Sequence, residues 1–105
     1  MPQYILKFLD KGNSYYMMWD TVKDAPITYG ASLDEFSRWY LRTYGAQIFE
    51  TELPKKIELA DRKGISSKMH NRMEDILSDN KAGDGGVELT KEQIVEKYIR
   101  ARSNK

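Results

Sequence analysis

The chain has 105 residues, enough for one domain that buries a core without disulfides or a structural metal. Hydrophobic residues make up 40% and charged residues 31%, as in ordinary globular domains. Cysteine is absent, which excludes disulfides, zinc–thiolate sites and thiol catalysis and fits a reducing cytoplasm. The 17 basic and 16 acidic residues give a formal charge of +1, so a strong overall field for nucleic acid is missing. No apolar run reaches the roughly 18 residues that predict a membrane span.

The first 20 residues predict a β-hairpin over about 3–20. Tyr4–Leu9 and Tyr15–Asp20 are rich in apolar and aromatic residues, and turn residues at 10–14 separate them. The hairpin loop can have two or four residues, and both lengths pair the same residues of the two strands in one register. In that register the opposite residues on one face are Tyr4 and Trp19, Leu6 and Met17, and Phe8 and Tyr15.

The face with these three pairs is the more apolar one. The other face mixes Ile5, Tyr16 and Met18 with polar residues. We therefore expect the three pairs to form the floor on which the first helix packs. An isolated hairpin is only marginally stable in water, so this packing is needed for the hairpin to form.

A linker over 21–31 leads to the helix with the clearest signals, at about 32–45. Within the linker, residues 27–29 suit a short third strand. Ser32 and Glu35 form a capping box, and Gly45 suits the end of the helix. Acidic residues in the first turn and Arg42 in the last turn interact favourably with the helix dipole and so stabilise this helix. The apolar stripe consists of Leu33, Phe36, Tyr40 and Tyr44, with Trp39 and Leu41 on its flanks.

Three further helices are predicted at about 54–63, 67–80 and 91–102. Pro54 suits the first position of its helix and Gly64 follows the end. Serines 66 and 67 suit the start of the next helix, and Thr90 with Gln93 makes a second capping box. Residues 46–53 remain open between a continued helix and a connector. The chain 1–105 is therefore predicted to be a single α+β domain, a hairpin with three to four helices packed on it.

Catalytic signals are weak, and we do not expect an enzyme. His70 is the single histidine, so no site with two histidines exists and no metal or cofactor is expected. Ser66 and Ser67 lie near His70, but no nucleophile elbow or oxyanion motif surrounds them. The glycines at 83–86 lack the lysine and hydroxyl residue of a phosphate-binding loop, so a plain flexible loop is favoured.

The aromatic residues exceed what a small core can fully bury. The chain has seven tyrosines, three phenylalanines and two tryptophans, and tyrosine and tryptophan are enriched in binding hot spots. The residues expected to be exposed for a partner are Tyr16, Met18, Tyr29 and Trp39. A hairpin edge beside them could accept a partner strand. The first hypothesis is therefore a non-enzymatic module that binds and modulates a protein partner. The sequence leaves its oligomeric state open, and a homodimer is among the states allowed.

A basic stretch supplies the second hypothesis, nucleic-acid binding. Between residues 53 and 73 six cations accompany two acids, Glu58 and Asp61. The six are Lys55, Lys56, Arg62, Lys63, Lys68 and Arg72. Phosphate contacts from such a stretch give an affinity that falls steeply with salt. A third hypothesis is a small anionic ligand, such as a nucleotide, near this stretch or the glycine loop.

The order of these motifs resembles a group of small bacteriophage-encoded proteins of similar length. The segments that carry the resemblance include Tyr15–Asp20, Asp24–Gly30, Ser32–Phe36, Lys63–Ser67 and Leu89–Ile94. The resemblance implies an accessory phage protein in the host cytoplasm, and such proteins often act by binding and modulating a host protein, including defence factors. It implies no activity and no functional residue.

Overall fold

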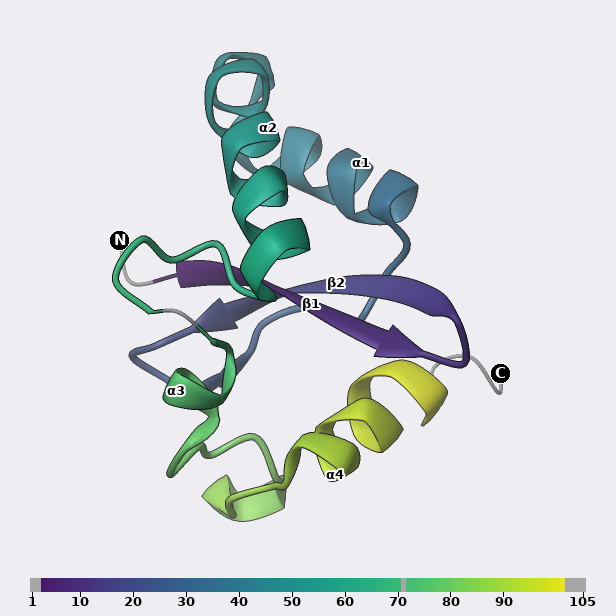
Figure 1. Ribbon diagram of the computed structural model, residues 1–105, viewed down its shortest axis with the longest axis vertical. Coiled ribbons are helices and arrows are strands. Elements are labelled where there is room, and N and C mark those ends of the chain that lie inside the picture. Colours follow the sequence, from purple (N-terminus) through teal and green to yellow (C-terminus); the bar gives the residue numbers. More distant parts are fainter. Residues whose placement is uncertain (1–2, 71, 102–105) are drawn as a thin grey trace.

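The computed structural model describes residues 3–70 and 72–101 and has the predicted α+β class (Figure 1). An antiparallel sheet in the order β1-β2-β3 packs against four α-helices. The strands are β1 (Gln3–Asp10), β2 (Asn13–Asp20) and β3 (Ala25–Pro26). The helices are α1 (Leu33–Tyr44), α2 (Ala46–Lys63), α3 (Glu74–Leu77) and α4 (Lys91–Val95), with a 3-10 turn η1 (Asp84–Gly86) and a π-helical segment η2 (Glu96–Arg100).

The hairpin has the predicted register. Tyr4 pairs with Trp19, Leu6 with Met17 and Phe8 with Tyr15. The loop is the two-residue alternative, Lys11-Gly12, with φ of 51° and 82°. Positive φ at both loop residues defines a type I′ turn, whose twist matches that of the two strands. Glycine suits the second position because it adopts positive φ without strain.

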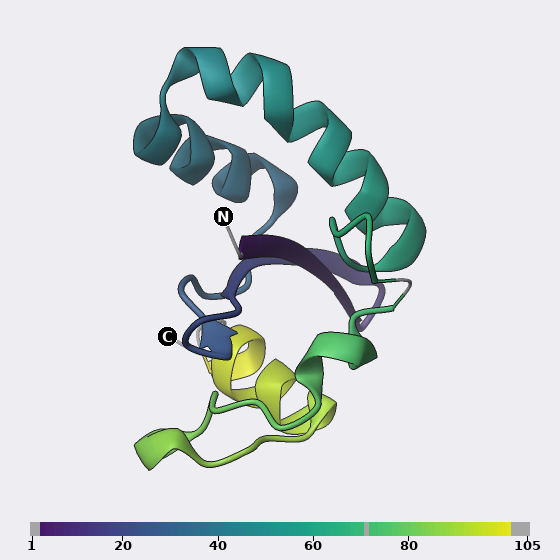
Figure 2. The same ribbon diagram turned by 90° about the vertical axis from the view of Figure 1, so that its left-hand side faces the viewer.

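Helices cover both faces of the sheet, α1 and α2 on one side and α3 and α4 on the other (Figure 2). The predicted floor for α1 is therefore wrong. Phe36 and Tyr40 of α1 share a buried cluster with Ile5, Tyr16 and Met18 from the mixed face. The more apolar face packs on the C-terminal layer, in a cluster that includes Leu6, Phe8, Met17, Trp19, Ile94 and Ile99.

The physical reason is the composition of the mixed face, which is apolar enough to bind a helix pair. Ile5 and Met18 are almost fully buried there. Lys7 also lies on this face, and its ammonium reaches Asp61 of α2 at 3.1 Å. Because each face receives its own helix pair, the hairpin is the central layer of the domain.

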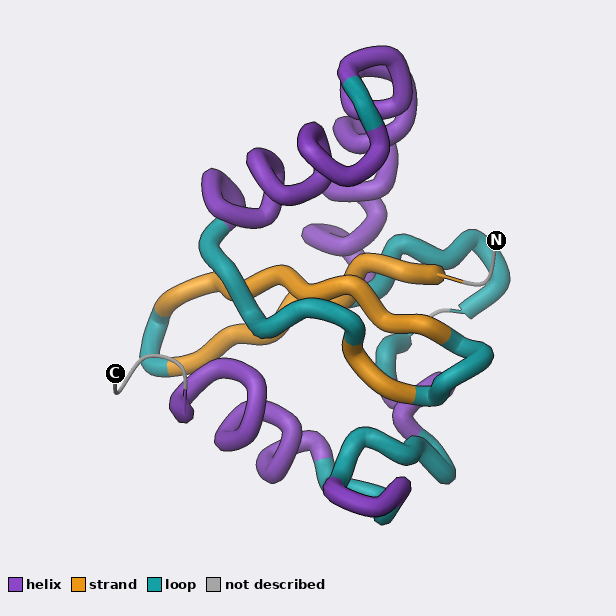
Figure 3. The backbone as a smooth tube through the Cα atoms, turned by 180° about the vertical axis from the view of Figure 1, so that it is seen from behind, coloured by secondary structure: helices purple, strands orange, loops and turns teal. Residues whose placement is uncertain are grey.

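Other segments cover both edges of the hairpin (Figure 3). Along β2, Tyr16 exchanges two backbone hydrogen bonds with Ala31, at 2.7 and 2.9 Å, and Ile27 donates to the carbonyl of Met18. The third strand is thus real but lies at Ala25–Pro26, before the predicted residues 27–29. Along β1, Lys7 donates to the carbonyl of Gly64 at 3.0 Å. A partner strand therefore cannot pair with these stretches of either edge, contrary to the expectation of an open hairpin edge.

Helix α1 has the predicted limits and capping. The Ser32 hydroxyl accepts from the backbone N–H of Glu35 at 3.2 Å, and the Glu35 carboxylate accepts from the backbone of Ser32. Phe36 and Tyr40 are buried as expected, whereas Leu33 is 43% exposed.

Helix α2 starts earlier than predicted, at Ala46, and so includes the open residues 46–53. Pro54 lies inside it and removes one N–H donor. Pro54 is exposed, so water can bind the carbonyl left without a donor, and the helix continues to the predicted end before Gly64, which has φ of 84°.

The third helix is much shorter than the predicted 67–80. The chain after Gly64 first pairs with β1, where Ser66 accepts from Ile5 at 2.8 Å and donates its own N–H to the Ile5 carbonyl. Only Glu74–Leu77 is helical among the described residues of this segment. The last helix starts at Lys91 with the predicted Thr90–Gln93 capping box, and its predicted end at 102 lies outside the described residues.

Candidate partner-binding groove

The linker and α1 enclose a groove of about 390 Å³. Residues 27–29 form one side and α1 forms the other. The groove brings together Tyr29 and Trp39, two of the four residues predicted for partner binding. Its lining also includes Ile27, Thr28, Phe36, Arg38 and Arg42.

The linker side of the groove is held in place from both directions. Met18 of β2 donates its N–H to the Thr28 hydroxyl at 3.0 Å. Gly30 donates to the carbonyl of Tyr98 at 2.8 Å, and the ring of Tyr29 lies 5.8 Å from that of Tyr98. Tyr29 is therefore positioned before any partner binds, although 55% of its surface remains exposed.

The helical side of the groove rests on an aromatic cluster. Trp39 is half-buried, with its ring 5.5 Å from Phe36 and 5.8 Å from Tyr44. Phe36 is 1% exposed and anchors this cluster in the core. Because its neighbours restrict the indole, little side-chain entropy remains to be lost on binding.

Two arginines give the groove a positive rim. Arg38 pairs with Asp34 one turn earlier on α1. Arg42 is exposed, and among the residues that the structure describes it has no ion pair. Glu35 also lines the groove, but its carboxylate serves the N-terminal cap of α1. The rim therefore offers a guanidinium, a planar donor that suits a carboxylate.

The other two predicted partner residues are buried, so the expectation that they are exposed is wrong. Tyr16 is 4% and Met18 is 2% exposed, because α1 and α2 cover their face of the hairpin. The Tyr16 hydroxyl donates to Asp61 at 2.7 Å. Burial, followed by the Asp61 carboxylate, raises the pKa of Tyr16 to about 12. Tyr16 thus joins β2 to α2 and is a structural residue.

The six cations of the basic stretch lie in several different environments. Lys56 lies 3.4 Å from the Tyr40 hydroxyl, between α1 and α2. Lys63 and Arg72 line a separate cleft at the β1 edge. The remaining three, Lys55, Arg62 and Lys68, are exposed. Nucleic-acid binding through the whole stretch stays a prediction.

Ser67 and His70 do meet, at 3.0 Å between Oγ and Nδ1. The same oxygen accepts from the backbone N–H groups of Met69 and His70, at 3.0 and 3.1 Å. Two backbone donors and the imidazole nitrogen thus surround this hydroxyl within one turn of the chain. Ser67 is 1% exposed, so this hydroxyl closes a turn and is out of reach of a substrate.

Within the described ranges, 3–70 and 72–101, no group of three histidine or acidic side chains is arranged to hold a metal ion. No helix in the same ranges is long and apolar enough to cross a membrane.

Sequence reasoning missed the arginines of the groove. In the sequence, the position of Arg42 in the last turn of α1 is explained by the helix dipole alone and does not indicate a binding site. The available signal was helical spacing, since Glu35, Arg38, Trp39 and Arg42 repeat at three and four residues and share one side of α1.

Comparisons with protein-family models, with curated proteins and with solved structures find no match to this chain. The class that its own fold and groove define is a small α+β domain with an aromatic groove rimmed by arginine.

Proposed function

We propose that this protein is a non-enzymatic binding module whose groove between residues 27–29 and α1 receives a segment of a protein partner. The observation that supports it is the juxtaposition of Tyr29 and Trp39, from different parts of the chain, with Arg42 at the same rim. Tyrosine, tryptophan and arginine are the residue types most enriched in binding hot spots.

The partner's chemistry follows from the lining. Ile27, Tyr29 and Trp39 suit an apolar or aromatic side chain, and a volume of about 390 Å³ accommodates one or two such side chains. Arg42 suits a carboxylate next to that side chain. The partner segment is therefore an acidic one with an apolar anchor. The resemblance to phage-encoded proteins makes a cytoplasmic host protein, such as a defence factor, the first partner class to test.

The experiment is an affinity pull-down of the tagged protein from bacterial extract treated with nuclease, read by mass spectrometry. Two groove variants, Tyr29→Ala and Arg42→Glu, are compared with two exposed controls, Leu41→Ala on α1 and Arg62→Glu on α2. A protein recovered by the wild type and both controls, but lost with both groove variants, supports the proposal. Equal recovery by all five forms contradicts it.

The alanine variant of Trp39 is a poor probe of binding. Its ring packs on Phe36, Tyr40 and Tyr44, so truncation loosens the core as well as the groove. Tyr29 and Arg42 are exposed, and their variants should retain the wild-type thermal unfolding transition.

A further inference from the structure

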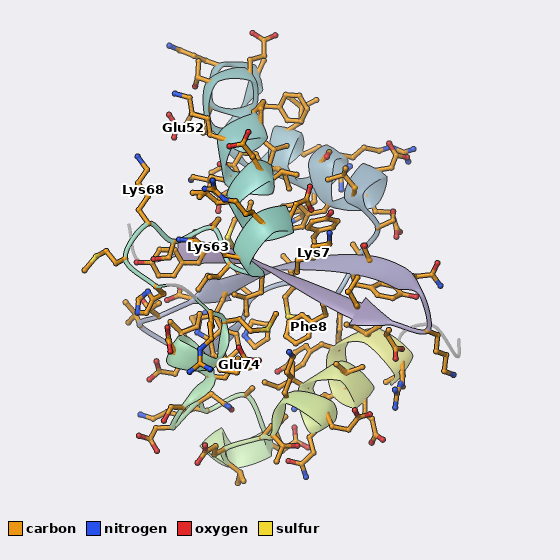
Figure 4. All side chains as sticks on the ribbon, viewed as in Figure 1. Lys7, Phe8, Glu52, Lys63, Lys68 and Glu74 are labelled. Atoms are coloured by element: carbon orange, nitrogen blue, oxygen red, sulfur yellow. The ribbon has the colours of Figure 1, made fainter. Side chains whose placement is uncertain are left out.

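A second and larger cavity lies at the β1 edge, whereas the groove lies beside β2. Its volume is about 650 Å³. It lies where the end of α2, strand β1, α3 and the start of α4 meet. Figure 4 shows Lys7, Phe8, Lys63 and Glu74 around this region, from three different elements.

The cavity has apolar and charged parts. Phe8, Met73 and Val95 supply an apolar floor, and Leu9, which is 73% exposed, supplies an apolar side chain that a ligand can cover. Charged side chains also line the cavity, and they are Lys7, Asp61, Lys63, Arg72, Glu74, Lys91 and Glu92.

Pairing these charges shows which of them a ligand could use. Lys7 lies 3.1 Å from Asp61, and Lys91 lies 3.0 Å from Glu74. Glu92 binds Arg100 at 2.7 Å. The three acids of the cavity therefore already have cations.

Two cations remain. Lys63 has no carboxylate within salt-bridge distance among the residues that the structure describes, and Arg72 reaches Asp75 only at 3.6 Å, with both side chains exposed to solvent. An exposed pair at that distance contributes little free energy, so Arg72 is available to a ligand. The cavity is thus locally positive at Lys63 and Arg72, although it is nearly balanced overall.

We propose that this cavity binds a nucleoside monophosphate. Lys63 and Arg72 bind the phosphate, since an ammonium and a guanidinium are the side chains that most often bind phosphate oxygens. The base covers Leu9 and the apolar floor. The carboxylates of Glu74 and Glu92 keep lone pairs that can accept hydrogen bonds from ribose hydroxyls. Phosphate, base and sugar thus each have a matching part of one cavity.

The site is independent of the groove proposed for the protein partner. It shares no lining residue with that groove. Variants at Arg42 should therefore leave nucleotide binding unchanged.

The test is titration calorimetry of the full chain with adenosine 5′-monophosphate, adenosine and inorganic phosphate. Adenosine 5′-monophosphate should bind more tightly than either half-ligand, and its affinity should fall with added salt. Lys63→Gln and Arg72→Gln should each weaken it by about tenfold, the loss expected for one charge-assisted hydrogen bond. Lys55→Gln and Lys68→Gln are matched controls from the basic stretch outside the cavity, and they should bind as the wild type does.

Three results would overturn the proposal. One is no heat with adenosine 5′-monophosphate at millimolar concentration while the protein remains folded by circular dichroism. Another is equal binding of inorganic phosphate and the nucleotide, which would leave the apolar floor without a role. The last is an equal loss in the two controls, which would make the binding a diffuse effect of surface charge.

Discussion

Asn80 and Leu89 bind each other through two hydrogen bonds across a loop of the chain. The Asn80 side-chain amide donates to the Leu89 carbonyl at 2.8 Å, and its oxygen accepts from the Leu89 N–H at 3.0 Å. The same side chain donates to the carbonyl of Leu77 and accepts from the N–H of Ala82. Asn80 is 2% exposed, so one buried amide closes the segment between α3 and α4. Composition alone predicts this segment to be a flexible loop.

Asn80→Ala should lower the free energy of unfolding by about 3 kcal/mol, because it leaves buried backbone N–H and C=O groups without partners. Asn80→Asp should be no better, since a carboxylate would face two carbonyl oxygens. Urea unfolding followed by circular dichroism measures both changes. The neighbouring exposed variant Lys81→Ala is the control and should change the value by less than about 0.5 kcal/mol. A loss at Asn80 as small as that of the control would contradict this account of the loop.

Gly30 is required by close packing of the linker on the C-terminal layer. A Cβ at this position would lie 2.5 Å from Cγ1 of Ile99. Gly30→Ala should therefore destabilise the protein by about 1–3 kcal/mol, as overpacking does. It should also weaken partner binding, because the adjacent Tyr29 would shift. A double-mutant cycle with Ile99→Ala tests the cause, since the cost of Gly30→Ala should shrink once that side chain is truncated. An unchanged cost would show that the clash is not the reason.

Arg100 joins the C-terminal layer to the hairpin turn. Its Nε and Nη2 donate to the two carboxylate oxygens of Asp10, at 3.2 and 2.8 Å. These bonds from Arg100 hold the pKa of the Asp10 carboxyl below its ordinary value of 3.8. The folded state thus binds this proton less tightly than the unfolded state. The contribution of the pair is complete above the ordinary pKa of 3.8 and is lost as the pH falls from there through the lowered pKa of the folded state.

Stability should accordingly decline as the pH falls below about 4 in the wild type, and less steeply in Asp10→Asn. A backbone hydrogen bond, followed by the hydrogen bond from Lys91, likewise lowers the pKa of Glu74, so part of the decline should persist in the variant. Urea unfolding at several pH values measures the slopes. Parallel slopes for the two proteins would mean that Asp10 does not contribute to acid sensitivity.

The two tryptophans should behave differently in fluorescence. Trp19 is fully buried, whereas Trp39 is half-buried at the groove. Acrylamide should quench Trp39 and spare Trp19, and Trp39→Phe should leave a blue-shifted emission that acrylamide hardly changes. A bound partner should protect Trp39 in the wild type. Strong quenching in Trp39→Phe would contradict the burial of Trp19.

The sequence predicts the local elements of this fold well. The hairpin register follows from alternating apolar residues around Lys11-Gly12, and α1 and the start of α4 follow from their capping boxes. These signals depend on residues a few positions apart. The same local logic predicted a helix from Ser67, but pairing of Gly64–Ser66 with β1 leaves only a short α3.

The layer order and the site depend on contacts between distant residues. Both hairpin faces carry apolar residues. The more apolar face, with Leu6 and Met17, predicts the wrong side for α1, because Ile5 and Met18 make the other face apolar enough to bind a helix pair. The helix that covers Tyr16 and Met18 removes them from the surface, whereas Tyr29 stays exposed. Sequence pattern identifies Tyr29 and Trp39 as surplus aromatics, but only the fold brings them together beside Arg42.

The most direct test of the groove is site-specific photocrosslinking in bacterial extract. Benzoylphenylalanine replaces Tyr29 in one protein and Met69, which is 86% exposed and outside the groove, in another. We predict a nuclease-resistant crosslinked protein from position 29 that Arg42→Glu abolishes and that position 69 does not give. Crosslinking from position 69 alone, or crosslinking from position 29 that Arg42→Glu leaves intact, would contradict the proposal that this groove binds the partner.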